Sequence, residues 1–363
     1  MMSKRYPVWI INPLLSIASF CLFLAGIEIF CRILPCGEYD ELRINDPYYY
    51  IETIGDIRHH VPFYTYMERV PLRFDFHSYY TKTDGIVPFN SNQFGARWLE
   101  SGYQEDADTT VLVLGDSFTY GHGLYYSDTF VFRLEQNLND DNRSIRFMNL
   151  AERGADARDV LKTYERYKDS ISHSVVLYGL HVNDLVNFST SSAITNLLAV
   201  PWLTKYSKGF AFLTEKLERH WFRRFIIGRM TSCTRFKKSF FRENMVAITR
   251  LNAAAHAQGA RLVVVILPIV LDLKQDTFLS LYGGILHRLK NNRIECIDLT
   301  RSLDNQNDED MWILPFDQHP NHRANALFAT RLSVEFRRFY CHEQRRTLAG
   351  TTTHQRKNLS ESD

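Results

Sequence analysis

The sequence of 363 residues predicts an α/β protein in which a mostly parallel sheet of five strands lies between two layers of helices, preceded by one transmembrane helix. Two observations predict the sheet. Short apolar runs rich in β-branched residues are typical of buried parallel strands, and segments with helical patterning alternate with these runs. A third observation, an uncharged apolar run near the N-terminus, predicts the membrane helix.

The strands and helices alternate along most of the chain. The predicted strands are residues 109–114, 144–150, 174–178, 261–267 and 293–299. The predicted helices are residues 128–138, 156–167, 277–289 and 321–339. Alternation of this kind means that consecutive strands run parallel and that the connecting helices cover both faces of the sheet.

The chain divides into four regions. Residues 1–36 form a cytoplasmic stub and a membrane anchor, and residues 37–108 form a polar, tyrosine-rich extension that we expect to be irregular. Residues 109–340 carry the sheet, and residues 341–363 form a polar tail that we expect to be disordered.

The anchor is predicted from residues 8–27, which contain no charged side chain. About 20 such residues in a helix span the hydrocarbon core of a bilayer. Lys4 and Arg5 precede the run, and beyond Glu28 and Arg32 the next charged residues are acidic, starting with Glu38, so the N-terminus is expected in the cytoplasm. The rest of the chain would then lie outside, which in a Gram-negative cell is the periplasm. The alternative is a cleaved signal peptide.

Charge and motif content exclude some partners. The formal net charge is +2, without the basic bias of a nucleic-acid binder. The chain has no phosphate-binding or dinucleotide-binding glycine pattern and no metal-ligand spacing of cysteine and histidine. We therefore expect no nucleic acid, metal or organic cofactor. The sequence does not predict the oligomeric state.

A serine follows the first predicted strand directly, in the run Gly115, Asp116, Ser117. Ligands of open parallel sheets bind beyond the carboxyl ends of the strands, so this hydroxyl is placed where a substrate would enter. Backbone N–H groups at the same strand-to-helix turn would face an incoming carbonyl group. The alternative is that Asp116 or Ser117 simply caps the next helix.

Two further polar clusters are expected at the same edge of the sheet. Asn183 and Asp184 follow the third strand, and Asp317 and His319 precede the last helix. A serine needs a base to become a nucleophile, and the base needs an acid to orient it. Asp317 and His319 are two residues apart, so in extended backbone they share a face.

Two other histidines are rival bases. His122 and His181 both lie near the motifs, but neither follows an acidic residue at a spacing of two or three. We therefore favour His319.

The order of these motifs resembles the SGNH (GDSL-type) hydrolase family, in particular bacterial members with an N-terminal membrane helix. The resemblance rests on G-D-S-F-T-Y-G after the first strand, a glycine after the second, N-D after the third, and D-Q-H-P-N before the last helix. The segment N-S-N-Q-F-G-A-R over residues 90–97 is also similar to one that precedes the first strand in those proteins. Together these motifs cover residues 88–340.

The resemblance implies a role for each matching residue. Ser117 matches the nucleophile, His319 its base and Asp317 the acid that orients the base. Ser117, Gly154 and Asn183 match the residues that form the oxyanion hole. The spacing D-x-H departs from the D-x-x-H of many family members.

The resemblance also implies an activity outside the cytoplasm. We expect a serine esterase that hydrolyses O-acyl esters, O-acetyl esters among them, through an acyl-enzyme. One alternative is an O-acyltransferase that uses the same residues on envelope or secreted polysaccharide. A second alternative is a non-catalytic glycan-binding or assembly protein on the same scaffold.

Residues 201–242 interrupt the alternation of strands and helices with a basic, aromatic-rich segment. An ordinary helical insertion would bury the aromatic side chains and leave the basic ones in solvent. The functional alternative is a cap beside the site that faces anionic lipid headgroups or an acidic glycan.

Overall fold

The structure is a computed structural model that describes part of the chain in detail. The described residues are 8–33, 51–54, 57–60, 65–69, 86–98, 107–139, 144–185, 238–274, 278–314 and 317–339. Residues 201–237 of the predicted insertion and the polar tail lie outside these ranges, while residues 238–242 belong to a long helix described below.

The chain divides into two compact units. The first comprises Met1–Asn45, Arg69–Ile86 and Ser189–Gly228, and the second comprises Asp46–Glu68, Val87–Phe188 and Arg229–Asp363. In the first unit, α1 spans Val8–Ile33. Within the described ranges, none of the helices combines the length and the apolar character that crossing a membrane requires.

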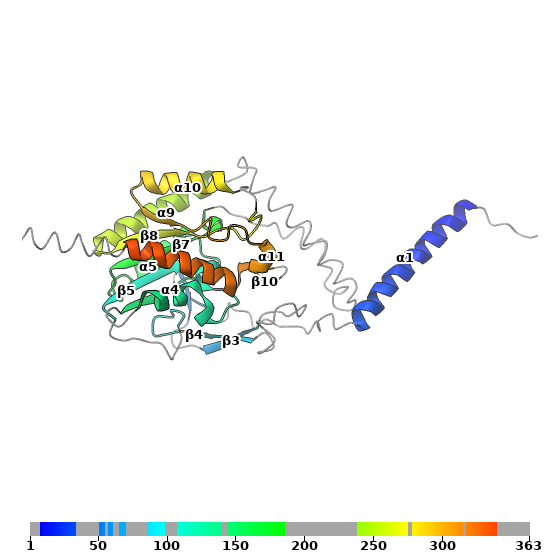
Figure 1. The fold of residues 1–363 in the computed structure, drawn as a ribbon, viewed down its shortest axis with the longest axis horizontal. Helices are drawn as coiled ribbons and strands as arrows, with labels where there is room; N and C mark the ends of the chain where they lie inside the picture. Colours follow the sequence, from blue (N-terminus) through cyan, green and yellow to red (C-terminus); the bar gives the residue numbers. More distant parts are fainter. Residues whose placement is uncertain are drawn as a thin grey trace, which may run out of the picture. The chain divides into compact units, whose positions relative to one another are not determined.

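The second unit is built around a parallel sheet, which confirms the α/β fold predicted from the sequence (Figure 1). The strand order is β6-β5-β7-β8-β9. The five strands are β5 (Thr109–Gly115), β6 (Ile145–Asn149), β7 (Val175–Leu180), β8 (Arg261–Ile266) and β9 (Glu295–Asp298). All four neighbouring pairs are parallel, and each strand lies within two residues of its predicted start.

Helices cover both faces of this sheet, as right-handed crossovers require. On one face, α4 (Phe130–Leu138) packs against the last helix, residues 322–339, through Phe130 and Phe328. On the other face, α5 (Ala157–Tyr167) packs against α9 (Lys238–Ala257). α10 (Leu279–Asn291) lies beside α9 and connects β8 to β9 (Figure 1).

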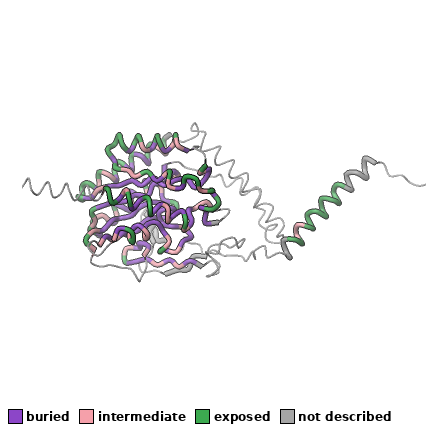
Figure 2. Tube along the Cα trace, in the orientation of Figure 1, coloured by how far each residue is buried: buried purple, intermediate pink, exposed green. Residues whose placement is uncertain are grey.

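Burial follows from this layering. β7 is buried along its whole length and β8 over all but its first residue, because each lies between two neighbouring strands and two helical layers (Figure 2). β9 is a sheet edge, and its two end residues are exposed while its two middle residues are half-buried. The other edge, β6, is partly covered because Arg97 pairs with Asn149 at its end.

Three parts of the fold differ from the sequence prediction. The extension expected to be irregular contains four short strands, β1 (Ile51–Ile54), β2 (Ile57–His60), β3 (Thr65–Arg69) and β4 (Ile86–Asn90). α9 was not predicted as a separate element, although it forms the crossover from β7 to β8. The segment before the last helix, for which no strand was predicted, pairs as β10 (Trp312–Leu314) and β11 (Asp317–Pro320).

Candidate active site

The turn after β5 places Ser117 at the carboxyl edge of the sheet. Gly115 pairs with Gly179 in the next strand and has a φ of 154°, a conformation that favours glycine. A Cβ on Gly115 would lie 2.7 Å from the carbonyl oxygen of Gly179, and a Cβ on Gly179 would overlap the hydroxyl of Thr119. The two glycines therefore let the short helix α3 (Ser117–Tyr120) lie directly against β7.

The structure separates the two roles that the sequence left open for Asp116 and Ser117. Asp116 is the N-cap of α3, because its Oδ1 accepts a hydrogen bond from the backbone N–H of Phe118 at 2.9 Å. The Ser117 side chain is therefore not needed as a cap. Its Oγ lies 2.8 Å from Nε2 of His319, within hydrogen-bond distance.

His319 lies on β11 and is held there by two buried asparagines. Asn321 donates from Nδ2 to the carbonyl oxygen of Trp312 at 3.0 Å and accepts from the N–H of Ala324 at 3.1 Å, so it joins β10 to the last helix. Asn325 donates to the carbonyl oxygen of Pro320 at 2.9 Å and accepts from the N–H of Phe130 at 2.9 Å. These bonds fix the backbone on the C-terminal side of the histidine.

Asp317, the predicted partner of His319, lies on the same short strand two residues earlier. Its side chain falls outside the described part of the structure, so its role remains a prediction.

The structure brings Asn183 to the same edge of the sheet, in the turn Val182–Asp184 that follows β7. Oδ1 of Asn183 lies 2.7 Å from Nδ1 of His181. Oδ1 can only accept, so His181 donates and the Nδ2 amide of Asn183 keeps its two N–H donors for another acceptor.

Asp184 is fully buried and accepts from the hydroxyl of Tyr178 at 2.8 Å. Burial, together with the nearby Asp116 carboxylate, raises the pKa of Asp184 well above its ordinary value.

Gly154 lies beyond the end of β6, in a turn closed by a 3.2 Å hydrogen bond from the N–H of Ala155 to the carbonyl oxygen of Glu152. Its φ is 74°, and a Cβ would meet no atom within 4 Å. Glycine is favoured here by backbone conformation and not by space. The turn is tied to the nucleophile loop, because the N–H of Glu152 donates to the carbonyl oxygen of Gly115 at 3.0 Å.

The two rival bases have other contacts. His181 is buried and stacks on Phe118, with ring centroids 3.8 Å apart and 15° between the planes. Burial lowers the pKa of His181, while the Asp116 carboxylate acts in the opposite direction. His122 lies 3.1 Å from a guanidinium nitrogen of Arg153 through its Nδ1, and its ring is 4.6 Å from that of His319.

A buried arginine that sequence analysis did not single out supports the far end of α3. Arg97 is 2% exposed, and Nη1 donates to the carbonyl oxygens of Tyr120 at 2.9 Å and Gly121 at 2.7 Å. Nη2 donates to the carbonyl oxygen of Leu124. The sequence of residues 90–97 predicts only a resemblance to the family and no structural role for Arg97. Its arginine, a charged residue beside apolar ones, was the available signal.

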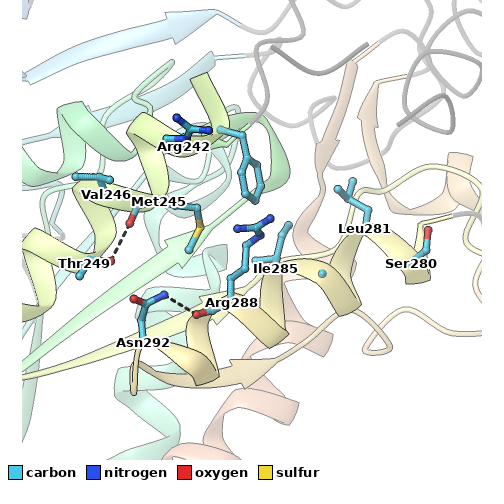
Figure 3. A pocket seen from close by; sticks show the side chains of 11 residues that line it. Arg242, Met245, Val246, Thr249, Ser280, Leu281, Ile285, Arg288 and Asn292 are labelled. Carbon is cyan, nitrogen blue, oxygen red and sulfur yellow. Dashed lines mark hydrogen bonds between the residues drawn. The ribbon is translucent and has the colours of Figure 1, made fainter. Parts of the chain in front are cut away.

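A cavity lies elsewhere, between α9 and α10 (Figure 3). Its volume is about 510 Å³. The side chains that line it include Met245, Thr249, Ile285 and Arg288, and none of the predicted catalytic residues is among them.

Comparison with protein-family models finds no match, and neither does comparison with curated proteins. Solved structures do match. The psychrotrophic esterase EstA from Pseudoalteromonas sp. is 14% identical with a TM-score of 0.41, and the match covers 64% of this chain and 99% of that one. A member of the lipolytic protein G-D-S-L family from Veillonella parvula is 12% identical with a TM-score of 0.38, covering 61% and 95%. Axe2, an acetylxylan esterase from Geobacillus stearothermophilus, is 12% identical with a TM-score of 0.41, covering 63% and 94%. These structures are what the chain is similar to, and one of them carries the name of the G-D-S-L family that the sequence motifs resemble.

Proposed function

We propose that this protein is a serine esterase of the SGNH type that hydrolyses O-acyl esters through an acyl-enzyme. The observation that carries the proposal is the 2.8 Å distance between Oγ of Ser117 and Nε2 of His319. A neutral imidazole at this distance can accept the serine proton as the oxygen attacks an ester carbonyl.

The reaction proceeds in two halves. Oγ of Ser117 bonds to the carbonyl carbon while its proton moves to Nε2 of His319, and the carbonyl oxygen becomes an oxyanion. The tetrahedral intermediate then expels the alcohol, which takes the proton from His319. In the second half, water gives a proton to His319 as its oxygen attacks the acyl-enzyme. His319 then returns this proton to Oγ of Ser117 as the acid leaves.

The oxyanion needs donors that face it before it forms. We assign this role to the backbone N–H groups of Ser117 and Gly154 and to the Nδ2 amide of Asn183. The proposal is supported by the hydrogen bond that occupies Oδ1 of Asn183, because the amide nitrogen is then left to face the substrate. Removal of one such donor costs about 10²–10³-fold in kcat, and Asn183→Ala should fall in this range.

The first test is loss of activity in point variants. Ser117→Ala and His319→Ala should each lower hydrolysis of p-nitrophenyl acetate by at least about 10³-fold, because one removes the nucleophile and the other its base. A fluorophosphonate probe, which forms a covalent bond to an activated serine, should label the wild-type chain and not Ser117→Ala.

Matched controls are available on α10. Ser280 and His287 are exposed there, so Ser280→Ala and His287→Ala should hydrolyse the ester and accept the probe like the wild type. Full activity in folded Ser117→Ala or His319→Ala would rule out the assignment. An acetylated glycan donor offered with a second glycan distinguishes hydrolysis from transfer, since a transferase would move the acetyl group to the acceptor.

We also propose that residues 8–27 anchor the protein in a membrane, with the catalytic unit on the outer side. The proposal is supported by the absence of charged residues in this run and by its large apolar side chains, several of which are exposed on α1. The exposed large apolar residues of this run are Ile17, Phe20, Leu22, Phe23 and Leu24. A periplasmic reporter fused to the C-terminus should be active, and activity of a cytoplasmic reporter at that position would contradict the topology.

A further inference from the structure

His181 follows β7 directly, and its side chain contacts both α3 and Asn183. α3 carries the proposed nucleophile, and Asn183 is the proposed side-chain donor of the oxyanion hole. The residue is 7% exposed. One nitrogen, Nδ1, lies 2.7 Å from Oδ1 of Asn183 and 3.8 Å from Oδ2 of Asp116. No described residue offers a hydrogen-bond partner to the other nitrogen, Nε2.

These contacts fix the tautomer of the ring. Both atoms that face Nδ1 are acceptors, so the proton belongs on Nδ1. Nε2 then carries only a lone pair, whereas a proton there would leave a donor buried without an acceptor among the described residues.

The carboxylate of Asp116 strengthens this assignment. It is fully buried, and its Oδ1 is already occupied by the N–H of Phe118. Its Oδ2 has no hydrogen-bond partner among the described residues, and it lies on the Nδ1 side of the ring. A negative charge at this distance favours a proton on Nδ1 and keeps the donor directed at the loop.

The ring is also fixed in orientation. It stacks on Phe118, the residue that follows Ser117, with the planes only 15° apart. Rotation of His181 would break both the stack and the hydrogen bond to Asn183.

We propose that His181 is a positioning residue that sets the orientation of the Asn183 amide, so that Nδ2 and not Oδ1 faces the oxyanion. Without the donor at Nδ1, the Asn183 side chain can turn over and present its carbonyl oxygen to a negative charge. Asp116 acts through His181, so one aspartate caps the nucleophile helix and also supports the oxyanion hole. This inference rests on the proposed esterase function.

The test compares three variants of the full chain with p-nitrophenyl acetate. Asparagine carries its amide nitrogen at the δ position, where Nδ1 of histidine lies, and glutamine carries it one bond further out. His181→Asn should therefore keep kcat within about fivefold of the wild type, whereas His181→Gln should lose about 10–100-fold with little change in KM. His181→Phe keeps an aromatic ring for the stack and loses the donor, and it should behave like His181→Gln.

A double variant shows whether His181 acts through Asn183. Once Asn183→Ala has removed the amide, adding His181→Gln should lower kcat less than about twofold further. A role confined to packing would lower kcat by the same factor in both backgrounds. Thermal midpoints of all variants identify any loss that comes from unfolding.

The outcomes separate this inference from the function on which it rests. Equal losses in His181→Asn and His181→Gln, or full activity in His181→Gln, overturn the positioning role while wild-type activity stands. A wild-type chain that neither hydrolyses the ester nor takes up the fluorophosphonate probe overturns the esterase function itself, and the positioning role with it.

Discussion

At the scale of single residues, the position of Ser117 depends on two glycines, which have no side chain. Gly115 and Gly179 face each other across β5 and β7, and Thr119 fills the space above both. The Thr119 hydroxyl donates to the carbonyl oxygen of Gly179 at 3.2 Å. Any side chain on either glycine would push α3 away from the sheet and move Ser117 relative to His319.

This contact predicts the effect of one methyl group. Gly179→Ala should lower stability by about 1–3 kcal/mol and also lower kcat, because the new Cβ overlaps the Thr119 hydroxyl. Adding Thr119→Ala removes that oxygen and should restore part of both losses. Thermal unfolding and ester hydrolysis measure the two effects.

Gly283 provides the control. It is exposed on α10, and a Cβ there would meet no atom within 4 Å. Gly283→Ala should be neutral or stabilise the helix by about 0.5–1 kcal/mol. If Gly179→Ala unfolds at the wild-type temperature, the close approach of α3 to β7 is not a constraint.

At the scale of elements, α3 is only four residues long and cannot hold its own position. Asp116 caps its beginning, and Arg97 binds the carbonyl oxygens at and beyond its end. Asn149 adds a third support, since its Nδ2 donates to the carbonyl oxygen of Thr119 at 3.1 Å. Arg97, which lies between β4 and β5, therefore helps to orient Ser117 from outside the five-stranded sheet.

Arg97→Lys should lower stability by at least about 2 kcal/mol and reduce kcat, because one ammonium group cannot replace a guanidinium that reaches three carbonyl oxygens. Arg331→Lys is the control, since the Arg331 side chain is 59% exposed and forms a surface ion pair with Glu335. That change should alter stability by less than about 0.5 kcal/mol. Similar unfolding midpoints for the two variants would show that the buried arginine has no special role.

At the scale of the whole molecule, the elements that could be predicted from sequence are those whose own residues carry a clear pattern. Residues 262–266 are apolar and mostly β-branched, and they lie in the predicted strand β8. α9 was missed because its first turn continues the basic, aromatic pattern of the preceding segment, which hides its start. β10 and β11 have three and four residues and a proline, too few for an alternating pattern.

The site divides in the same way. Ser117 and His319 were predictable because each follows or precedes a recognisable element and belongs to a motif. His181 was considered only as a rival base, because its partners Phe118, Asp116 and Asn183 come together only when two loops converge. Pairings of this kind depend on tertiary structure, and a single sequence does not contain their signal.

Overall stability should depend on pH through Glu135, which links α4 to β6. Burial raises its pKa from 4.5 to about 7, although a hydrogen bond from the N–H of Phe147 and the charge of Arg146 oppose the shift. Below about pH 4.5 the carboxyl group is protonated in both the folded and the unfolded chain. As the pH rises toward 7, the unfolded chain loses this proton first, so the free energy of unfolding falls.

Glu135→Gln should remove this component. The thermal midpoint of the wild type should decrease relative to that of Glu135→Gln as the pH rises from 4.5 to about 7. These limits are the ordinary and the raised pKa of Glu135. Glu309→Gln, a change at an exposed position of α11 (Asp308–Met311), should leave the wild-type pH profile unchanged. A parallel pH profile for Glu135→Gln would contradict the raised pKa.

The two residues that meet at 2.8 Å in the site are 202 positions apart in the chain. A ribosome that adds about 5–20 residues per second makes the serine roughly 10–40 s before the histidine. The histidine is held in place by Asn321 and Asn325, at the start of the helix over residues 322–339, so the pair can form only after both asparagines have been made. Under the proposed mechanism, a nascent or prematurely terminated chain carries a serine that no base can activate. Under that mechanism the protein cannot act on esters until translation has passed these asparagines.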